Sequence, residues 1–207
     1  MNHFPHYSDM DVSLNSFVDS IFDKLSLNAT TFHKKTFENC TFKNSDFQDS
    51  KFISCKFVDC TFESCNLANI DIQNSFFTTV IFEKSKVIGV NWARAKWPLI
   101  NLTCSIQFYE CNISESSFFE LELIEMIMQG CKAHNVDFRG TNLSRASFVS
   151  TNFQNSLFLE TNLDGADFTE AYDYNIHPNK NNIKHAKFSF PEVLSLLNHF
   201  EIEIEGI

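Results

Sequence analysis

The sequence predicts an all-β solenoid, built as a right-handed stack of square coils, on three observations. An apolar residue recurs at every fifth position from Phe22 to Leu102. A small residue, often Cys or Ser, lies two places before most of these positions. A period of five fits neither the 3.6-residue repeat of a helix nor the two-residue repeat of a strand. A chain that turns a corner every five residues satisfies the pattern, and four corners close a coil of about 20 residues, a period typical of stacked repeats.

The first run of the repeat is clearest at residues 40–67, and a second run extends from Phe108 to Phe168 after one extra residue near 103–105. We expect the central residue of each five-residue block to point into the core, where each buried Phe contributes roughly 1.5–3 kcal/mol. Gly and Pro together number only nine among 207 residues, which argues against a disordered or collagen-like chain. The predicted core includes Phe42, Phe47, Phe52, Phe57, Phe62, Phe138, Phe148, Phe153, Phe158 and Phe168.

The chain divides into an N-terminal cap or tail at residues 1–19, the repeat at residues 20–173, and a C-terminal loop, helix and apolar tail at residues 174–207. Ser189 and Glu192 have the spacing of a capping box, and Pro191 lies in the first turn, so we expect a short α-helix that ends near Phe200. This segment either caps the open end of the solenoid or caps it and also forms a homodimer. Its apolar residues are Val193, Leu194, Leu196, Leu197, Phe200, Ile202 and Ile204.

The pattern is broken in two regions of the sequence. Trp92, Trp97 and Pro98 precede the shift of one residue in the repeat, which predicts a bulge or kink at residues 92–108 but no inserted loop. Lys35 occupies an inward position near the N-terminal end of the rod. We expect its long side chain to reach water there.

Cysteine spacing follows the repeat and not a metal site. Six of the seven Cys lie at the small inward position, and only Cys104 does not. Their five-residue spacing differs from the C-x₂-C of zinc sites, and free Cys packs as a small buried hydrophobe. No run of 18 apolar residues and no secretory signal is present, so we expect a cytoplasmic protein with reduced thiols and no membrane segment.

No catalytic or phosphate-binding motif occurs in the sequence, and the seven His have no ligand spacing. We therefore expect neither an enzyme nor a cofactor or metal site. The acidity is uneven: residues 108–173 carry 11 acidic and 3 basic side chains, whereas residues 1–107 carry 11 and 10. These acids either are solvated solenoid surface or form a partner-binding acidic face: Glu110, Glu115, Glu120, Glu122, Glu125, Asp137, Glu160, Asp164 and Asp167.

The blocks CTFES-CNLAN, VDFRG-TNLSR-ASFVS-TNFQN and TNLDG-ADFTE resemble the A(D/N)LXX consensus of pentapeptide repeat proteins. The resemblance covers about residues 20–173 and implies a right-handed quadrilateral β-helix. The terminal helix and apolar tail are similar to those of the Qnr and MfpA group, in which a C-terminal module makes a tail-to-tail dimer. That resemblance implies a homodimer, binding to DNA gyrase or topoisomerase IV, mimicry of duplex DNA, and resistance to quinolones or other gyrase poisons.

Two hypotheses of different class follow. In the first, an acidic rod binds a type II topoisomerase in place of DNA, through a continuous acidic stripe. In the second, the protein is a non-catalytic scaffold or effector-type interaction module with another protein partner. A net charge of −10 disfavours direct binding to nucleic acid, because phosphates repel an acidic surface.

Overall fold

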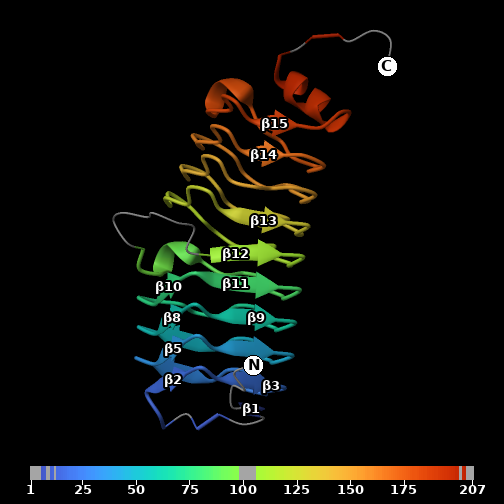
Figure 1. The fold of residues 1–207 in the computed structure, drawn as a ribbon. Helices are drawn as coiled ribbons and strands as arrows, with labels where there is room; N and C mark the ends of the chain where they lie inside the picture. Colours follow the sequence, from blue (N-terminus) through green and yellow to red (C-terminus); the bar gives the residue numbers. More distant parts are fainter. Residues whose placement is uncertain (1–5, 8–9, 12, 98–105, 201, 204–207) are drawn as a thin grey trace.

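The computed structural model describes residues 6–7, 10–11, 13–97, 106–200 and 202–203. The chain forms a right-handed β-helix of about 8 turns whose coils stack along a single axis (Figure 1). Neighbouring coils pair in parallel, with Phe42 opposite Phe22 on one side and Phe62 on the other. Each central residue thus meets the one four blocks away, which confirms the predicted fold class and the four-block coil.

The strands are short, and each lies on one side of the coil. The largest sheet has seven strands: β1 (His6–Tyr7), β3 (Ile21–Asp23), β6 (Thr41–Lys43), β9 (Thr61–Glu63), β11 (Val80–Glu83), β12 (Ile106–Tyr109) and β13 (Ile127–Gln129). A second sheet has four: β2 (Ser16–Val18), β5 (Thr36–Glu38), β8 (Lys56–Val58) and β10 (Phe76–Thr78). Two pairs remain: β4 (Thr31–His33) with β7 (Lys51–Ile53), and β14 (Asp167–Phe168) with β15 (Lys187–Phe188).

The core is a stack of aromatic rings inside the coils. Phe42 stacks on Phe62 with ring centroids 4.7 Å apart and planes 11° apart, while Phe42 and Phe47 meet edge to face at 5.6 Å. Both arrangements are favourable for aromatic pairs. All ten Phe predicted for the core are buried, and the most exposed of them, Phe158, is only 6% exposed.

Corners in which Asp or Asn precedes the central residue share one local structure. The Asp or Asn side chain accepts a hydrogen bond from the backbone N–H two residues on, as Asp46 does from Gln48 at 3.0 Å. A turn follows, closed by the Ser50 N–H donating to the Phe47 carbonyl at 3.0 Å. Asp and Asn favour such turns, whereas the β-branched Thr favours strands. The corner that begins at Thr41 is accordingly a strand, β6.

One coil is longer than the others, which corrects the sequence analysis. Val80 pairs with Ile106, and the Ser85 N–H donates to Cys111 Sγ, so partners on this coil lie 26 residues apart. The prediction of a one-residue shift without an inserted segment is wrong. The additional length equals one five-residue block plus one residue. The whole block keeps the five-residue period, so the sequence pattern reveals only the single extra residue. Leu102 and Cys104 lie outside the described residues.

The parallel ladder extends past both predicted boundaries of the repeat. At the N-terminal end β1 and β2 pair with β3 and β5. This first coil covers Lys35, whose side chain was expected to reach water. Lys35 is instead 8% exposed, and its Nζ donates to the Leu14 carbonyl at 2.6 Å and to Asn15 Oδ1 at 3.1 Å.

Beyond residue 173 another coil follows. Phe158 pairs with Ile176, and Asn162 pairs with Asn182. Fewer residues therefore separate Phe158 from its partner than separate Asn162 from its own. This shorter separation takes Ile176 out of the five-residue phase, which is why the sequence indicated a loop. This region contains the 3₁₀ helix η2 (Pro178–Lys180), and an earlier one, η1 (Trp92–Arg94), lies in the long coil.

The predicted C-terminal helix is present as η3 (Glu192–His199), with 3₁₀ rather than α geometry. The capping box does not form, because both of its side chains accept from N–H groups of the preceding coil. Ser189 Oγ accepts from Glu170 at 2.9 Å, and Glu192 Oε1 accepts from Asp173 at 2.7 Å. These bonds attach the helix to the last coil.

The apolar residues of the C-terminal segment have different environments. Leu196 is buried, and Val193 packs against the core. Leu194 and Leu197 are half-buried, Phe200 and Ile202 are exposed, and Ile204 lies outside the described residues. Across the described part of the chain, no helix combines the length and apolarity needed to span a membrane.

Candidate protein-binding surface

Four glutamates occupy the four corners of a single coil, and we call them the glutamate belt: Glu110, Glu115, Glu120 and Glu125. Each has a left-handed backbone, with φ between 52° and 62°, and each is exposed. Their N–H groups donate to carbonyls of the next coil at 2.8–3.0 Å, which fixes the corners. The side chains therefore point to four sides of the rod, as their five-residue spacing predicts.

A glycine on the next coil leaves room for one belt residue. Gly140 lies above Glu120 and has a φ of +67°. A Cβ on Gly140 would lie 2.9 Å from Glu120 Cγ, closer than side-chain atoms normally approach. The small residue in one coil thus allows the long acidic side chain in its neighbour.

Several predicted acids contact basic side chains. Asp137 forms two hydrogen bonds with Arg139, at 2.9 and 2.8 Å, and this guanidinium holds the pKa of the Asp137 carboxyl below its usual value. Glu125 pairs with Arg145 at 2.9 Å, one coil away. Asp164 contacts His185 at 2.8 Å, and Asp167 contacts Lys187 at 3.5 Å.

Amide side chains bind two further acids of the predicted face. Glu122 accepts from Asn142 at 2.7 Å, and Glu115 accepts from Asn135 at 2.6 Å. In both cases the partner lies 20 residues on, directly above the acid. Carboxylates on this part of the rod are therefore held in place by the neighbouring coil.

The nine predicted acids lie around the circumference of the rod and not along one side. Above Glu110, the same corner is occupied by Gly130 and then by Ser150, and above Glu125 by Arg145. The continuous acidic stripe expected for a DNA mimic is therefore not formed by these corner residues. The acidity forms a girdle instead.

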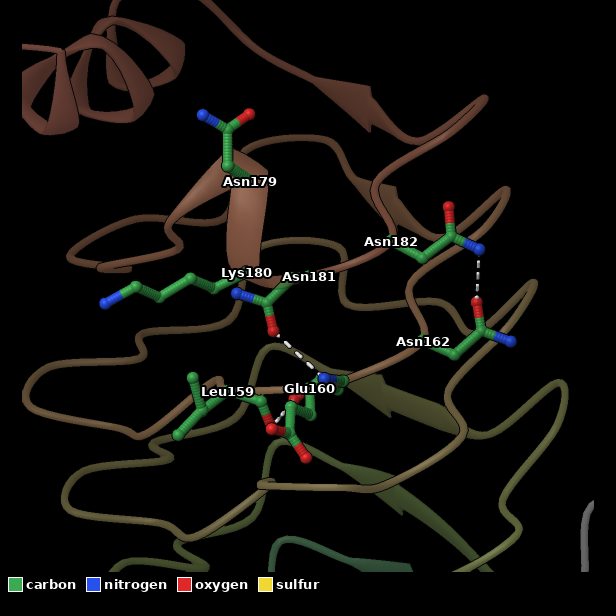
Figure 2. A pocket seen from close by; sticks show the side chains of 8 residues that line it. Leu159, Glu160, Asn162, Asn179, Lys180, Asn181 and Asn182 are labelled. Carbon is green, nitrogen blue, oxygen red and sulfur yellow. Dashed lines mark hydrogen bonds between the residues drawn. The ribbon is translucent and has the colours of Figure 1, made fainter.

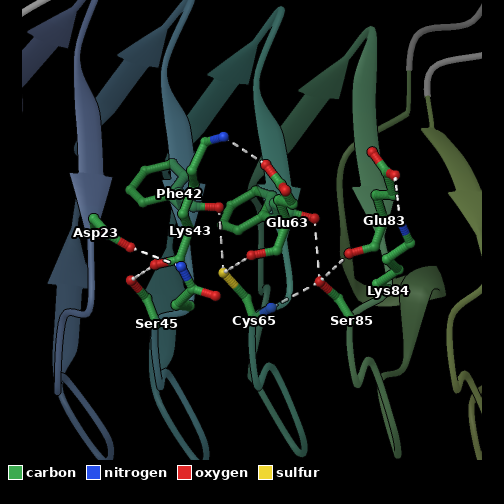
Figure 3. A network of polar contacts seen from close by, with 11 residues as sticks. Asp23, Phe42, Lys43, Ser45, Glu63, Cys65, Glu83, Lys84 and Ser85 are labelled. Carbon is green, nitrogen blue, oxygen red and sulfur yellow. Dashed lines mark hydrogen bonds and ion pairs between the residues drawn. The ribbon is translucent and has the colours of Figure 1, made fainter.

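Nearer the N-terminus, charges alternate along the rod. Figure 3 shows Lys43 between Asp23 and Glu63 on adjacent coils, with the Lys43 ammonium 2.7 Å from the Glu63 carboxylate. The hydrogen bond and charge of Glu63 raise the pKa of Lys43. Opposite charges on neighbouring coils cancel here, so this region adds little to the net charge.

Cysteines in the same view have a structural role. Cys65 Sγ donates to the Phe42 carbonyl at 3.4 Å, and the Cys65 N–H donates to Ser85 Oγ at 2.9 Å (Figure 3). Burial raises the pKa of Cys65 to about 12, so it stays a thiol. All six described cysteines are buried and free, which confirms the packing interpretation for them.

A shallow hollow of about 850 Å³ lies near the C-terminal end (Figure 2). Asn181 lines the hollow and bonds to the preceding coil. Its Oδ1 accepts from the Thr161 N–H at 3.0 Å, and its Nδ2 donates to the Phe158 carbonyl at 3.2 Å. Asn182 donates to Asn162 on the coil below at 2.9 Å. These side chains serve the stacking of coils. Among the described residues, no three His, Cys, Asp or Glu side chains are grouped so as to hold a metal ion.

Comparison with known families agrees with this architecture. The family model of the pentapeptide repeat region matches residues 15–92, 35–118 and 90–189. The chain belongs to the pentapeptide repeat family. No curated protein matches it by sequence.

Solved structures show the same fold in other pentapeptide repeat proteins. QnrB1, a plasmid-mediated fluoroquinolone resistance protein, aligns with a TM-score of 0.60 and 17% identity over 92% of each chain. HetL, a protein involved in heterocyst differentiation regulation in the cyanobacterium Nostoc, aligns with a TM-score of 0.58 and 12% identity over 83% of this chain and 84% of HetL. At such identities the likeness concerns the fold.

The sequence analysis missed the cross-coil partners of the acids in this pentapeptide repeat protein. Arg145 lies 20 residues after Glu125, and His185 lies 21 after Asp164. The necessary signal was available, because a coil of four five-residue blocks makes residues i and i+20 neighbours.

Proposed function

We propose that this pentapeptide repeat protein is a non-catalytic DNA mimic that binds a type II topoisomerase, DNA gyrase or topoisomerase IV. The observation that carries the proposal is charge density. Residues 108–173 have 11 acidic and 3 basic side chains, a net charge of −8. At about 20 residues per coil and roughly 4.8 Å between coils, they occupy about 16 Å of the rod. That is about one negative charge per 2 Å, close to the one per roughly 1.7 Å of duplex DNA.

The girdle arrangement supports the same proposal. Duplex DNA carries phosphates around its whole circumference, and the glutamate belt likewise presents carboxylates at all four corners. Ion pairs such as Glu125 with Arg145 do not cancel the excess, because the net charge already counts the basic residues. A basic surface shaped for duplex DNA would meet a comparable field.

The C-terminal end supports a homodimer. Phe190 is 77% exposed, Phe200 is 41% exposed, and Ile202 is 54% exposed, all near η3. Large exposed apolar side chains at one end of a molecule are suited to a protein interface. A tail-to-tail dimer would place both acidic halves at the centre of one rod.

The deciding experiment is DNA supercoiling by purified gyrase with the protein titrated in, with and without ciprofloxacin. We expect loss of supercoiling at high protein, or relief of drug inhibition at low protein. The variant Glu115→Lys with Glu120→Lys should weaken the effect at least tenfold, because it changes the net charge by four units at the belt.

A matched control lies on the same corner column as Glu115. Asp49 has a φ of 57° and accepts from Asn69 at 3.1 Å, as Glu115 accepts from Asn135. The variant Asp49→Lys with Asp59→Lys makes the same change of charge outside the acidic half and should retain activity. No effect of the wild type at large molar excess, or equal loss in both variants, would overturn the proposal.

The alternative is a scaffold with a different protein partner. It is favoured by the side-chain contacts of Asp137, Asp164 and Asp167, which leave these carboxylates engaged within the protein. Under this alternative gyrase is unaffected. Cross-linking in cell extract should then capture one stoichiometric partner other than a topoisomerase.

A further inference from the structure

A groove of about 460 Å³ runs across one side of the rod near its C-terminal end. Leu157 and Leu159 line its floor, Arg139 comes from the preceding coil, and Lys180 comes from the following one. Figure 2 shows Leu159 and Lys180 extending to the same side of the coil, away from Asn162 and Asn182. None of these groove residues was among the predicted site residues.

The floor of the groove is apolar and open to solvent. Leu157 is 49% exposed and Leu159 is 40% exposed, although both lie in well-paired coils. Phe119, 40% exposed, continues the strip two coils below, with the Arg139 guanidinium 5.7 Å from its ring centroid. Aliphatic side chains held open in this way are suited to contact with a partner.

The rim of the groove carries two imidazoles and the ammonium group of Lys180. His177 and His199 stack with centroids 4.6 Å apart and planes 19° apart, next to Lys180. His177 Nδ1 accepts from the Asn179 N–H at 3.2 Å, so its Nε2 carries the proton of the neutral ring. His199 Nε2 is buried and has no hydrogen-bond partner among the described residues.

Lys180 is the charged side chain that acts on His177 most directly, and Glu160 lies beside Lys180 and Leu159 in the neighbouring hollow. Desolvation, followed by the charges of His199 and Lys180, lowers the pKa of His177. Arg139 also lines the groove, and its carboxylate partner Asp137 is bound to it at 2.8 Å. The groove thus offers one ammonium group and one ion-paired guanidinium beside the strongly acidic residues 108–173.

We propose that this groove binds a short segment of a partner protein in which acidic residues alternate with aliphatic ones. The aliphatic side chains would cover Leu157 and Leu159, while the carboxylates would meet the Lys180 ammonium and the His177 Nε2–H. A nucleic acid is disfavoured, because it offers no aliphatic groups and the surrounding coils repel phosphate. This site goes beyond the proposed function, since it would accept an acidic partner and not a basic one.

The test measures the fluorescence anisotropy of a labelled peptide with the full-length protein. The probe is Glu-Ile-Glu-Ile-Glu-Gly-Ile, the sequence of residues 201–207, which combines the required side chains. We expect saturable binding, and none to the charge-inverted peptide Lys-Ile-Lys-Ile-Lys-Gly-Ile. Absence of binding, or equal binding of both peptides, would overturn the proposal. The readout is independent of gyrase, so its failure is distinguishable from failure of the proposed function.

Two variants locate the site, each with a control. Lys180→Glu should weaken binding at least tenfold, while Lys184→Glu, an exposed lysine that does not line the groove, should leave it unchanged. Leu157→Ser should weaken it about tenfold through lost apolar contact. Val18→Ser alters a residue 50% exposed at the other end of the rod and should have no effect. Equal losses in variant and control would place binding elsewhere and refute the assignment.

Protonation supplies a further readout. A bound carboxylate favours the charged imidazole, so binding of the probe should tighten as pH falls from 7.5 to 6. The variant His177→Gln should reduce this dependence without abolishing binding. A wild-type affinity that is constant over this range would contradict the assigned role of His177.

Discussion

The coils before residue 97 and those after residue 106 reach the same four-block register by different local structures. In the first region Thr, Lys or Ile usually precedes the central residue on three sides of the coil, and these corners form strands such as β5 and β8. In the second region Asn, Asp or Ser usually precedes it, and most corners are turns. An example is the turn closed by the Ala146 N–H donating to the Leu143 carbonyl at 3.1 Å.

The difference shows that the core sets the coil, whereas the corners of the coil can be either strands or turns. Asn142 Oδ1 accepts from the Ser144 N–H at 3.2 Å. In a turn the side chain thus satisfies a backbone N–H group that, in a strand, would pair with the neighbouring strand. Both kinds of corner still pair with the coils above and below. A solenoid can therefore change its surface chemistry along its length without changing its interior.

The largest effect should come from the core and should be alike in both regions. Phe57 stacks between Phe37 and Phe77 at 5.0 and 5.2 Å. Phe57→Ala leaves a cavity and should lower the free energy of unfolding by about 3–5 kcal/mol. Phe153→Ala in the second region should fall in the same range, because cavity size and not corner type determines the cost.

Urea unfolding followed by far-UV circular dichroism measures both changes. Phe57→Leu is the control, since it keeps most of the volume and should cost less than about 1.5 kcal/mol. A loss below about 1 kcal/mol for either alanine variant would show that the interior is not equally tight in the two regions.

A smaller effect is expected at the corners, where the regions differ. Asp46→Ala removes the acceptor of the Gln48 N–H and should cost about 0.5–1.5 kcal/mol, whereas Asp46→Asn keeps an acceptor oxygen. Thr36→Ala, in strand β5, removes no such acceptor and should cost less. Hydrogen exchange of the Gln48 amide gives the local readout. Unchanged protection in Asp46→Ala would show that the side chain does not determine the turn.

The loss of stability at acid pH should depend in part on an ion pair of the second region, Asp137 with Arg139. Arg139 lowers the pKa of Asp137 in the folded state, so this carboxyl contributes stability above its unfolded pKa of roughly 3.9. The contribution is lost as pH falls through the lower, folded value. Asp137→Asn should therefore flatten the stability profile below about pH 4 and leave its shape near neutral pH unchanged. An identical acid limb in the variant would exclude this pair as a contributor.

The fold was predictable because one period governs the entire interior. Every fifth residue from Phe22 to Trp97 and from Phe108 to Phe168 must be apolar to stack, so the sequence alone is sufficient to assign the core. The long coil was not predictable in the same way, since all but one of its extra residues match the period. Asn and Asp before central residues predict turns at those corners. Which surface side chains contact one another, however, depends on how successive coils stack.

The candidate surface was predictable in its composition and not in its layout. The glutamate belt follows directly from four glutamates spaced five residues apart. The groove beside Leu157 depends on the coil that contains Ile176, whose pairing with Phe158 falls outside the five-residue phase. The stack of His177 on His199 joins that coil to η3, and a contact of this kind is set by how the end of the solenoid closes.

The smallest effect, and the sharpest comparison of the two regions, concerns exposed ion pairs. Lys43–Glu63 lies where charges alternate, and Glu125–Arg145 lies in the acidic girdle. Each pair should contribute about 0.2–1 kcal/mol in a double-mutant cycle. The single variants should differ in sign: Glu63→Gln destabilises, because Lys43 loses its partner, whereas Glu125→Gln is neutral or stabilising, because it relieves repulsion among the girdle acids. Urea unfolding at low and high salt measures both, and the difference should shrink as salt screens the charges. Equal destabilisation by both variants at low salt would mean that net charge does not strain the second region.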